Sequence, residues 1–313
     1  MLRHLKSARS PLTLLLAAVA LAGSAGCSPQ EADRPLIVVS TNILGDVVEN
    51  VIGDEAEVLT LMQPNADPHS FEISAQQAAT MRQADLIVTN GLGLEEGLQQ
   101  HIDSANAGKV PLLVAGDVID VLNYGDDSTA GNSAGAADPH FWTDPERMIA
   151  VVSALQDRLS TIDGIDPETV KARAESYQAE LKQLDSDMTA AFTAIPEERR
   201  NLVTNHHVFG YLADRYGFNV IGAVIPGGTT LASPSASDLR DLVSAIEEAK
   251  VPTIFAESSQ PDRLVQVLAD GANIDVSVVE LFTESLTDPD GGADSYLTMM
   301  RTNTDRISTG LSP

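Results

Sequence analysis

Two of the six histidines in this 313-residue chain stand in the same local setting. The tetrapeptide Ala-Asp-Pro-His occurs at residues 66–69 and again at 137–140, and an aromatic residue closely follows each copy. Neutral imidazole is the side chain that most often ligates metals. The repeat therefore suggests that His69 and His140 serve one metal ion, with coincidence in an Ala- and Asp-rich chain as the alternative.

The Asp-Pro unit before each of these histidines has a mechanical consequence. Proline fixes its own φ angle and pushes the preceding residue towards an extended conformation. A histidine that follows such a stiff turn is held in place, as a preorganised metal ligand must be. Asp67 and Asp138 are also placed to accept a hydrogen bond from an imidazole N–H, the usual arrangement around a metal-bound histidine. A plain turn capped by Asp is the alternative.

The elements that must position these residues follow an alternating pattern. In the first half, apolar runs typical of buried strands occupy residues 36–42, 56–62, 85–91 and 110–116, with helical segments among them. In the second half, strands are predicted at 201–205, 219–226, 253–259 and 275–281. Strand–helix–strand order implies a parallel sheet covered by helices. The sequence therefore predicts an α/β fold with two parallel-sheet lobes.

A long helix is predicted between the two halves. Residues 166–168, Asp-Pro-Glu, have the form of a helix start. The apolar residues that follow are spaced alternately by four and three: Val170, Ala174, Tyr177, Leu181, Leu184, Met188 and Ala191. A helix from 167 to about 194 spans roughly 40 Å, which favours a rigid strut over a coiled coil. We expect a first lobe at 35–162, a linking helix at 163–195 and a second lobe at 196–313.

Two segments flank His140. Residues 123–137 are rich in Gly, Ser, Ala and Asp and cannot bury a core, so a solvated loop is expected there. Residues 143–146, Thr-Asp-Pro-Glu, have the spacing of a capping box and predict the start of a helix that runs to about residue 160.

Further polar candidates lie where predicted strands end. His206 directly follows the strand at 201–205, and Glu284 comes shortly after the strand that ends at 281. Ligands of open α/β sheets gather at the carboxyl ends of strands. Three neutral imidazoles and one carboxylate form a closed tetrahedral site of the kind that holds Zn²⁺ at about 2.0–2.2 Å. Taken singly, each histidine is more often a surface or core residue, and their spacing is no compact signature.

The N-terminus has the features of a secretory signal. Three basic residues precede a short apolar stretch at 12–22, and small residues then lead to Cys27, the only cysteine. We expect a signal peptide at 1–26 and a polar leader at 27–34. The residues before Cys27 resemble a bacterial lipobox, although Ser24 stands where Leu or a similar residue is usual. The resemblance implies a lipid on Cys27; plain cleavage and release is the alternative.

The charge of the chain restricts its partners. The sequence has 19 Lys and Arg against 45 Asp and Glu, a net charge of −26, which becomes −29 once the three basic residues of the signal are removed. Such a surface disfavours nucleic acid and an anionic membrane face and attracts cations, although solubility alone explains many of the carboxylates. The single cysteine excludes an internal disulfide and a cysteine-based zinc cluster.

Four segments together resemble the zinc/manganese ABC-transporter solute-binding protein family. They read PNADPHSFE (64–72), ADPHFWTDP (137–145), TNHHVFGYLADRYGF (204–218) and LFTESL with GGADSYLTMMRTNTDRI (281–286 and 291–307). The resemblance extends from about Pro35 to Ile307. It implies two α/β lobes joined by a rigid helix, a metal ion in the cleft between them, and an ABC permease as the partner of a lipid-anchored monomer.

The resemblance also implies a ligand set. It assigns ligand roles to His69 and His140 in the first lobe. In the third segment the family ligand precedes a phenylalanine by three residues, which selects His206 and leaves His207 as a neighbour. The fourth ligand is usually Asp in a Thr-Asp-Ser segment, and Glu284 occupies that position here with one additional methylene.

The resemblance does not assign a role to Glu257, and it does not decide between Zn²⁺ and Mn²⁺. Glu257 ends the segment TIFAE and rivals Glu284 as a ligand, but we expect it to support a ligand instead. Three imidazoles favour Zn²⁺, whereas relatives with two carboxylates and two histidines suit Mn²⁺. Zn²⁺ is therefore the expected transported ion, with Mn²⁺ as the alternative. The loop at 123–137 lacks the histidines that zinc-selective relatives often carry there.

Three functions are compatible with these residues. The first is a receptor without catalytic activity that captures Zn²⁺ outside the cell and delivers it to a permease. The second is a zinc hydrolase, which needs an open coordination position and a general base, for which Glu257 is the candidate. The third is a surface adhesin, whose binding to a host ligand would not depend on His69 and His140. Four closed ligands and no nucleophile favour the receptor.

Overall fold

The structure is a computed structural model that describes residues 34–125 and 135–313. The predicted signal peptide, Cys27 and nearly all of the polar leader lie outside the described residues. Contacts gather residues 35–313 into one compact unit. Within the described ranges, no helix is both long enough and apolar enough to cross a bilayer.

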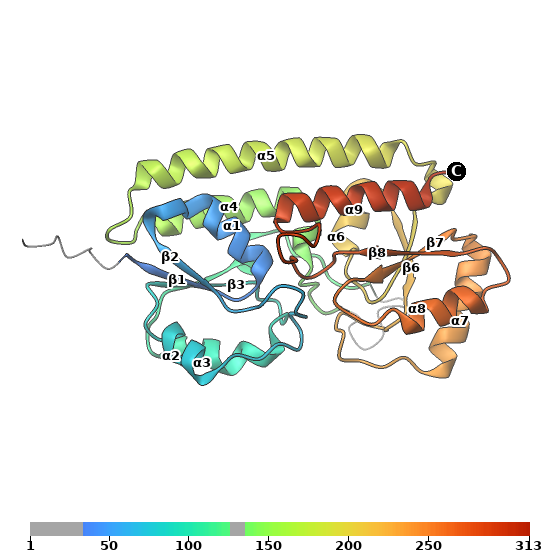
Figure 1. Cartoon of the computed structure of the whole chain (residues 1–313), viewed down its shortest axis with the longest axis horizontal. Helices are drawn as coiled ribbons and strands as arrows, with labels where there is room; N and C mark the ends of the chain where they lie inside the picture. Colours follow the sequence, from blue (N-terminus) through green and yellow to red (C-terminus); the bar gives the residue numbers. More distant parts are fainter. Residues whose placement is uncertain (1–33, 126–134) are drawn as a thin grey trace, which may run out of the picture. The chain divides into compact units, whose positions relative to one another are not determined.

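Among the described residues, eight strands form two four-stranded parallel sheets, as the alternation predicted (Figure 1). The first sheet consists of β1 (Leu36–Val39), β2 (Glu57–Thr60), β3 (Leu86–Thr89) and β4 (Leu112–Val114). The second consists of β5 (Asn201–Thr204), β6 (Asn219–Ala223), β7 (Thr253–Glu257) and β8 (Ser277–Leu281). Their orders, β2-β1-β3-β4 and β6-β5-β7-β8, are the same. In each sheet the connections after the two central strands leave towards opposite faces, and ligands of open α/β sheets bind at the carboxyl ends of such strands.

Helices cover both faces of each sheet. They are α1 (Asn42–Ile52), α2 (Ala75–Met81), α3 (Gln99–Ala107), α4 (Pro145–Leu159), α5 (Pro167–Thr193), α6 (Gly210–Tyr216), α7 (Ala236–Ala249), α8 (Arg263–Gly271) and α9 (Tyr296–Leu311). Helices α2 and α3 pack on one face of the first sheet, and α7 and α8 on one face of the second. The remaining helices lie on the other side of the sheets, where they share a single hydrophobic core.

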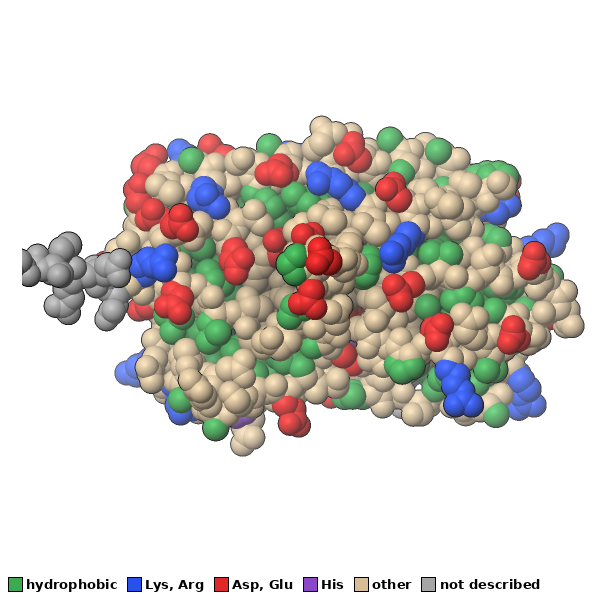
Figure 2. Space-filling model, in the orientation of Figure 1, with side chains coloured by type: hydrophobic (Ala, Val, Ile, Leu, Met, Phe, Trp, Pro, Cys, Tyr) green, Lys and Arg blue, Asp and Glu red, His purple; other side chains and the backbone are tan. Residues whose placement is uncertain are grey.

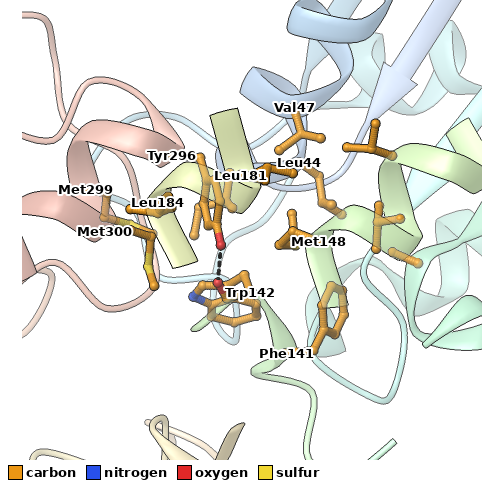
Figure 3. Close-up of a cluster of buried hydrophobic side chains, with 14 of the residues drawn as sticks. Leu44, Val47, Phe141, Trp142, Met148, Leu181, Leu184, Tyr296, Met299 and Met300 are labelled. Carbon is orange, nitrogen blue, oxygen red and sulfur yellow. Dashed lines mark hydrogen bonds between the residues drawn. The ribbon is translucent and has the colours of Figure 1, made fainter. Parts of the chain in front are cut away.

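That shared core is what joins the two sheets. It contains side chains from α1, α4, α5, α6 and α9 together with residues of both sheets. Figure 3 shows part of it, with Leu44 of α1, Met148 of α4 and Leu181 of α5 around Tyr296 of α9. The Tyr296 hydroxyl donates to the backbone oxygen of Trp142 at 2.7 Å. The sheets are therefore connected by a continuous apolar layer and not by the linking helix alone.

Helix α5 is the predicted long helix, and it runs along α1, α4 and α9 (Figure 1). Asp166 caps it by accepting a hydrogen bond from the Glu168 N–H, as its Asp-Pro-Glu start predicted. Six of the seven predicted apolar positions are buried, but the last position was wrong. Phe192 is buried in place of Ala191, because after several turns a 3.6-residue helix has drifted from a 3.5-residue pattern.

The start of α4 also differs from the prediction. The capping residue is Asp144, whose side chain accepts from the Glu146 N–H, and not Thr143. Thr143 instead donates to the backbone oxygen of His140 at 3.1 Å. The predicted box was wrong because Pro145 suits the first position of the helix and so makes the preceding Asp the cap. Thr143 is thereby left to brace the turn that carries His140.

An ion-pair network ties the linking helix to α4 and α6. Arg215 of α6 contacts Asp185 of α5 at 2.6 Å, Asp144 at 3.3 Å and Glu146 of α4 at 2.9 Å. These contacts raise the Arg215 pKa, chiefly through the hydrogen bond to Asp185. Because Asp144 is buried, this network fixes α4, α5 and α6 relative to one another.

Acidic side chains are distributed over the visible face of the molecule and interspersed with Lys and Arg (Figure 2). The strongly negative total therefore does not form one acidic patch on this face. This distribution is consistent with solubility as the main role of most of the carboxylates.

Asp46 of α1 is a carboxylate of the core layer with an unusual pKa. Its Oδ2 accepts the backbone N–H of Tyr296, the first residue of α9, at 3.0 Å. Burial, helped by the nearby charges of Glu49 and Asp294, raises the pKa of Asp46 to about 6 against the lowering effect of the hydrogen bond from Tyr296. In the unfolded chain an Asp pKa is about 3.9. The folded state therefore binds a proton here more tightly than the unfolded state.

We predict that Asp46→Asn raises the stability of the metal-free protein at pH 7 more than at pH 4, by about 2 kcal/mol. The contribution of protonated Asp46 to stability is present below about pH 4 and is lost as the pH rises through about 6, because the folded pKa is the higher one. Urea unfolding of wild type and variant across this range measures the difference. The exposed Asp120→Asn variant is the matched control for the loss of one charge, and a pH-independent difference for Asp46→Asn would contradict the prediction.

Candidate metal centre

The four residues with predicted ligand roles lie together in a buried cluster. His69, His140, His206 and Glu284 offer ligand atoms that all lie within 4.8 Å of one another. None of the four side chains is more than slightly exposed. The Glu284 Oε1 atom lies 2.9 Å from His69 Nε2 and 3.2 Å from both His140 Nε2 and His206 Nε2.

Each of these residues reaches the cluster from the end of an element. His69 follows β2 after a turn, and His140 immediately precedes the short 3-10 helix Phe141–Thr143 that leads into α4. His206 comes two residues after β5, and Glu284 three residues after β8. The first two histidines therefore belong to the first sheet and its connections, and the other two residues to the second. The cluster lies where the carboxyl ends of both sheets meet.

Two of the imidazole rings are held by buried carboxylates. His140 Nδ1 lies 2.8 Å from Asp138 Oδ1, which also accepts the His140 backbone N–H at 3.0 Å. His206 Nδ1 lies 3.1 Å from Glu257 Oε2. When Nδ1 carries the proton and donates to the carboxylate, Nε2 presents its lone pair to the centre of the cluster. This is how metal-binding histidines are usually oriented.

The ring of His69 is held differently, and the expected hydrogen bond from it to Asp67 is not made. The Asp67 Oδ1 atom accepts the backbone N–H of His69 at 2.8 Å. The Nδ1 atom of His69 is buried and has no hydrogen-bond partner among the described residues. The Asp67-Pro68-His69 turn therefore positions His69 through the backbone alone, although its sequence repeats that of the turn at His140.

Charges within the cluster are strongly coupled. Burial acts to raise the Glu284 pKa, but the charges of His206 and His69 outweigh it and hold the pKa well below its ordinary value. Burial likewise acts to lower the His206 pKa, and the charges of Glu284 and Glu257 raise it well above its ordinary value instead. The buried carboxylates favour positive charge at the centre of the cluster, which suits a bound cation. A metal ion that binds there displaces protons from the rings.

Two residues that the sequence analysis did not assign to the site hold the backbone around Glu284. Trp142 is buried in the core, and its indole N–H donates to the Thr283 backbone oxygen at 2.8 Å. Asn42, at the start of α1, accepts the Leu286 N–H at 2.9 Å. Each of these two hydrogen bonds joins a residue from the half of the chain that forms the first sheet to a residue that follows β8 of the second sheet. Trp142 sits two residues after His140 in the sequence, and that proximity was the one signal that could have indicated its role.

Glu95 and Asn90, which the sequence did not connect with the site, support the turn before His140. Glu95 is buried, and its Oε1 accepts the Ser40 hydroxyl and the Asn90 N–H, each at 2.6 Å. The Asn90 side chain donates to the Pro139 backbone oxygen at 3.0 Å. Burial raises the pKa of Glu95. This chain of contacts fixes the residue that directly precedes His140 to the carboxyl ends of β1 and β3.

A two-sheet α/β fold with a buried set of imidazoles and a carboxylate between the sheets defines a metal-binding solute-binding protein. Residues 37–310 match the family described as ZnuA, zinc-uptake complex component A, periplasmic, and the chain belongs to this family. It is a substrate-binding protein of a metal ABC transporter. Members of this family are solute-binding proteins and not enzymes, so the hydrolase interpretation was wrong.

Individual relatives are similar over nearly their whole length. The manganese ABC transporter substrate-binding lipoprotein PsaA of Streptococcus pneumoniae is 30% identical over 316 residues, covering 98% of this chain and 100% of that protein. The manganese-binding lipoprotein MntA of Halalkalibacterium halodurans is 28% identical, covering 92% and 94%. The solved structure of the periplasmic zinc binding protein TroA from Treponema pallidum has a TM-score of 0.81 and 30% identity, covering 90% of this chain and 100% of that one. The predicted fold is thereby confirmed.

We predict that Asp138→Asn and Glu257→Gln each weaken metal binding about 10- to 100-fold, because each removes the carboxylate that orients one histidine ring. Competition with a chelator of known affinity measures the change. Glu248→Gln, at an exposed position of α7, is the control and should bind as wild type does. Wild-type affinity in both buried variants would show that these carboxylates do not orient the rings of His140 and His206.

Proposed function

We propose that this protein captures Zn²⁺ outside the cytoplasm and delivers it to an ABC permease, with Mn²⁺ as the alternative ion. Its ligands are the Nε2 atoms of His69, His140 and His206 and the carboxylate of Glu284. The observation that carries the proposal is the convergence of these four groups, from both sheets, within 4.8 Å. The supporting residues are Asp138 and Glu257, which hold two of the rings.

The spacing of the four groups supports an ion at their centre. Two ligands of a tetrahedral zinc ion, each about 2.0–2.1 Å from the metal, lie about 3.3–3.4 Å apart. The Nε2 atom of His140 is 3.4 Å from Nε2 of His69 and 3.4 Å from Nε2 of His206. Small outward movements of Glu284 complete the tetrahedron. Its Oε2 atom is buried and has no hydrogen-bond partner among the described residues, which a cation would remedy.

The nature of the donors supports zinc. Three imidazoles and one carboxylate suit Zn²⁺, whereas Mn²⁺ favours sites with more oxygen ligands. The names of the relatives do not decide between the metals, because PsaA and MntA are called manganese proteins and TroA a zinc protein. A bidentate Glu284 would add an oxygen and favour Mn²⁺, so this one side chain governs the choice.

The proposal includes the organisation of the chain. We propose lobes at 35–162 and 196–313 with the linking segment at 163–195, which the two sheets and helix α5 support. We also propose that the mature protein is a monomer anchored by a lipid on Cys27. The names of several relatives, which describe them as lipoproteins, support the anchor.

We predict that the mature protein, stripped of metal and offered equimolar Zn²⁺, Mn²⁺ and Fe²⁺, retains one zinc ion per chain. Glu284→Gln preserves the size of the side chain but removes its charge, and it should lower zinc affinity by about 10-fold or more. Elemental analysis after gel filtration and chelator competition measure content and affinity. Glu280→Gln, an exposed position on β8, is the matched control.

Two results would contradict this assignment. Preferential retention of manganese would reject zinc as the ion. Unchanged zinc affinity in Glu284→Gln would remove Glu284 from the ligand set and leave Glu257 or a water molecule as the fourth ligand.

A further inference from the structure

Asp67 makes contacts that neither its sequence nor the ligand set explains. Its Oδ2 atom accepts the Thr230 hydroxyl at 2.6 Å and the Gln260 side-chain N–H at 2.9 Å. Thr230 lies between β6 and α7, and Gln260 between β7 and α8. Both donors therefore come from loops of the second sheet, whereas Asp67 follows β2 of the first. We call these three residues the Asp67 clasp.

The other oxygen of the same carboxylate acts on a metal ligand. Asp67 Oδ1 accepts the backbone N–H of His69, and Pro68 between them is stiff. One carboxylate thus joins the turn that carries His69 to two loops of the opposite sheet. Because hydrogen bonds to an ionised acceptor are shorter and stronger than neutral ones, movement of these loops is coupled to the position of His69.

His69 is also the ligand that most needs such a contact. The rings of His140 and His206 each have a carboxylate at Nδ1, whereas Nδ1 of His69 has no hydrogen-bond partner among the described residues. Its orientation depends on the turn and on what holds the turn. Asp67 is the residue that holds it.

The clasp differs from the other contacts between the two sheets in its exposure. Trp142 with Thr283, and Asn42 with Leu286, are buried contacts at the shared core. The three residues of the clasp are each only partly buried. The clasp can therefore open without disrupting the core, while the buried contacts around Glu284 stay closed.

We infer that Asp67, Thr230 and Gln260 are positioning residues that set how slowly the metal ion leaves the site. The inference rests on the proposed function, in which His69 is a ligand. When the clasp is closed, the second-sheet loops hold the Asp67-Pro68-His69 turn against the ion. When it opens, His69 is the first ligand to detach, because no carboxylate holds its Nδ1 atom from behind.

The test uses the Thr230→Val/Gln260→Met double variant of the mature protein, which removes both donors at nearly constant volume and leaves every ligand in place. Variant and wild type are each loaded with one Zn²⁺ and mixed with an excess of a colorimetric chelator in a stopped-flow instrument. We expect zinc release about 10-fold faster or more. The association rate should change less than about twofold, because affinity changes at one site arise mainly in dissociation.

Two single variants separate positioning from a general effect on the loop. Thr230→Ser keeps the hydroxyl and should release zinc as wild type does. Thr229→Val alters the neighbouring residue, whose hydroxyl oxygen accepts the Leu231 N–H within the same loop, and it should also leave release unchanged. Circular dichroism of the metal-free proteins checks folding. If the double variant does not fold, Thr230→Val and Gln260→Met are measured singly, and each should accelerate release.

The outcomes distinguish the two proposals. Wild-type release from the double variant, or equal acceleration by Thr229→Val, overturns the inference about the clasp while leaving the metal site intact. A wild-type protein that fails to hold one Zn²⁺ per chain overturns the proposed function itself. Faster release from the double variant with retention by Thr230→Ser establishes the clasp.

Discussion

Three imidazoles and a carboxylate buried within 4.8 Å of one another form an arrangement that folding alone does not favour. Buried polar atoms without partners cost free energy, and groups of like charge repel one another in a medium of low dielectric constant. The surrounding structure must therefore hold the cluster in place. Asp138 and Glu257 do so for two rings, and the backbone contacts of Trp142 and Asn42 do so for the segment that carries Glu284.

The shared core supplies the stiffness that these contacts need. A cluster built from the ends of two separate sheets keeps its geometry only if the sheets do not move freely. Here the apolar layer around α1, α4, α5 and α9 is continuous, and Arg215 links α4, α5 and α6 by ion pairs. Such packing resists large rotations of one sheet against the other, because a close-packed interior tolerates little change in volume. In the proposed function, metal exchange would therefore depend on the surface loops beside the cluster more than on separation of the lobes.

The sequence predicted the parts of the fold that local physics controls. Strand runs, the capped start of α5 and the four clustered side chains were recognisable because apolar periodicity, Asp-Pro turns and strand ends are local signals. The sequence did not reveal that the two Ala-Asp-Pro-His turns, at 66–69 and 137–140, make different contacts. Asp138 contacts the ring of His140. Asp67 instead accepts hydrogen bonds from Thr230 and Gln260, which lie in loops of the opposite sheet. The roles of Trp142 and Glu95 were equally hidden, since Trp142 donates to the distant backbone oxygen of Thr283 and Glu95 accepts from the distant hydroxyl of Ser40.

Glu284 stands where the family usually has Asp, and the surrounding backbone contacts determine how its longer side chain is accommodated. Its backbone is fixed on both sides, by Trp142 at Thr283 and by Asn42 at Leu286, so the added methylene must be accommodated by the side chain. The carboxylate consequently extends into the middle of the three rings, with Oε1 within 3.2 Å of each Nε2. The second oxygen remains buried beside it. Because the rings are held by the first sheet, the second sheet and a stiff turn, Glu284 is the member of the cluster whose side chain has the most freedom to adjust. In the proposed site, binding through one oxygen or two would set the coordination number, and through it the preference among metals.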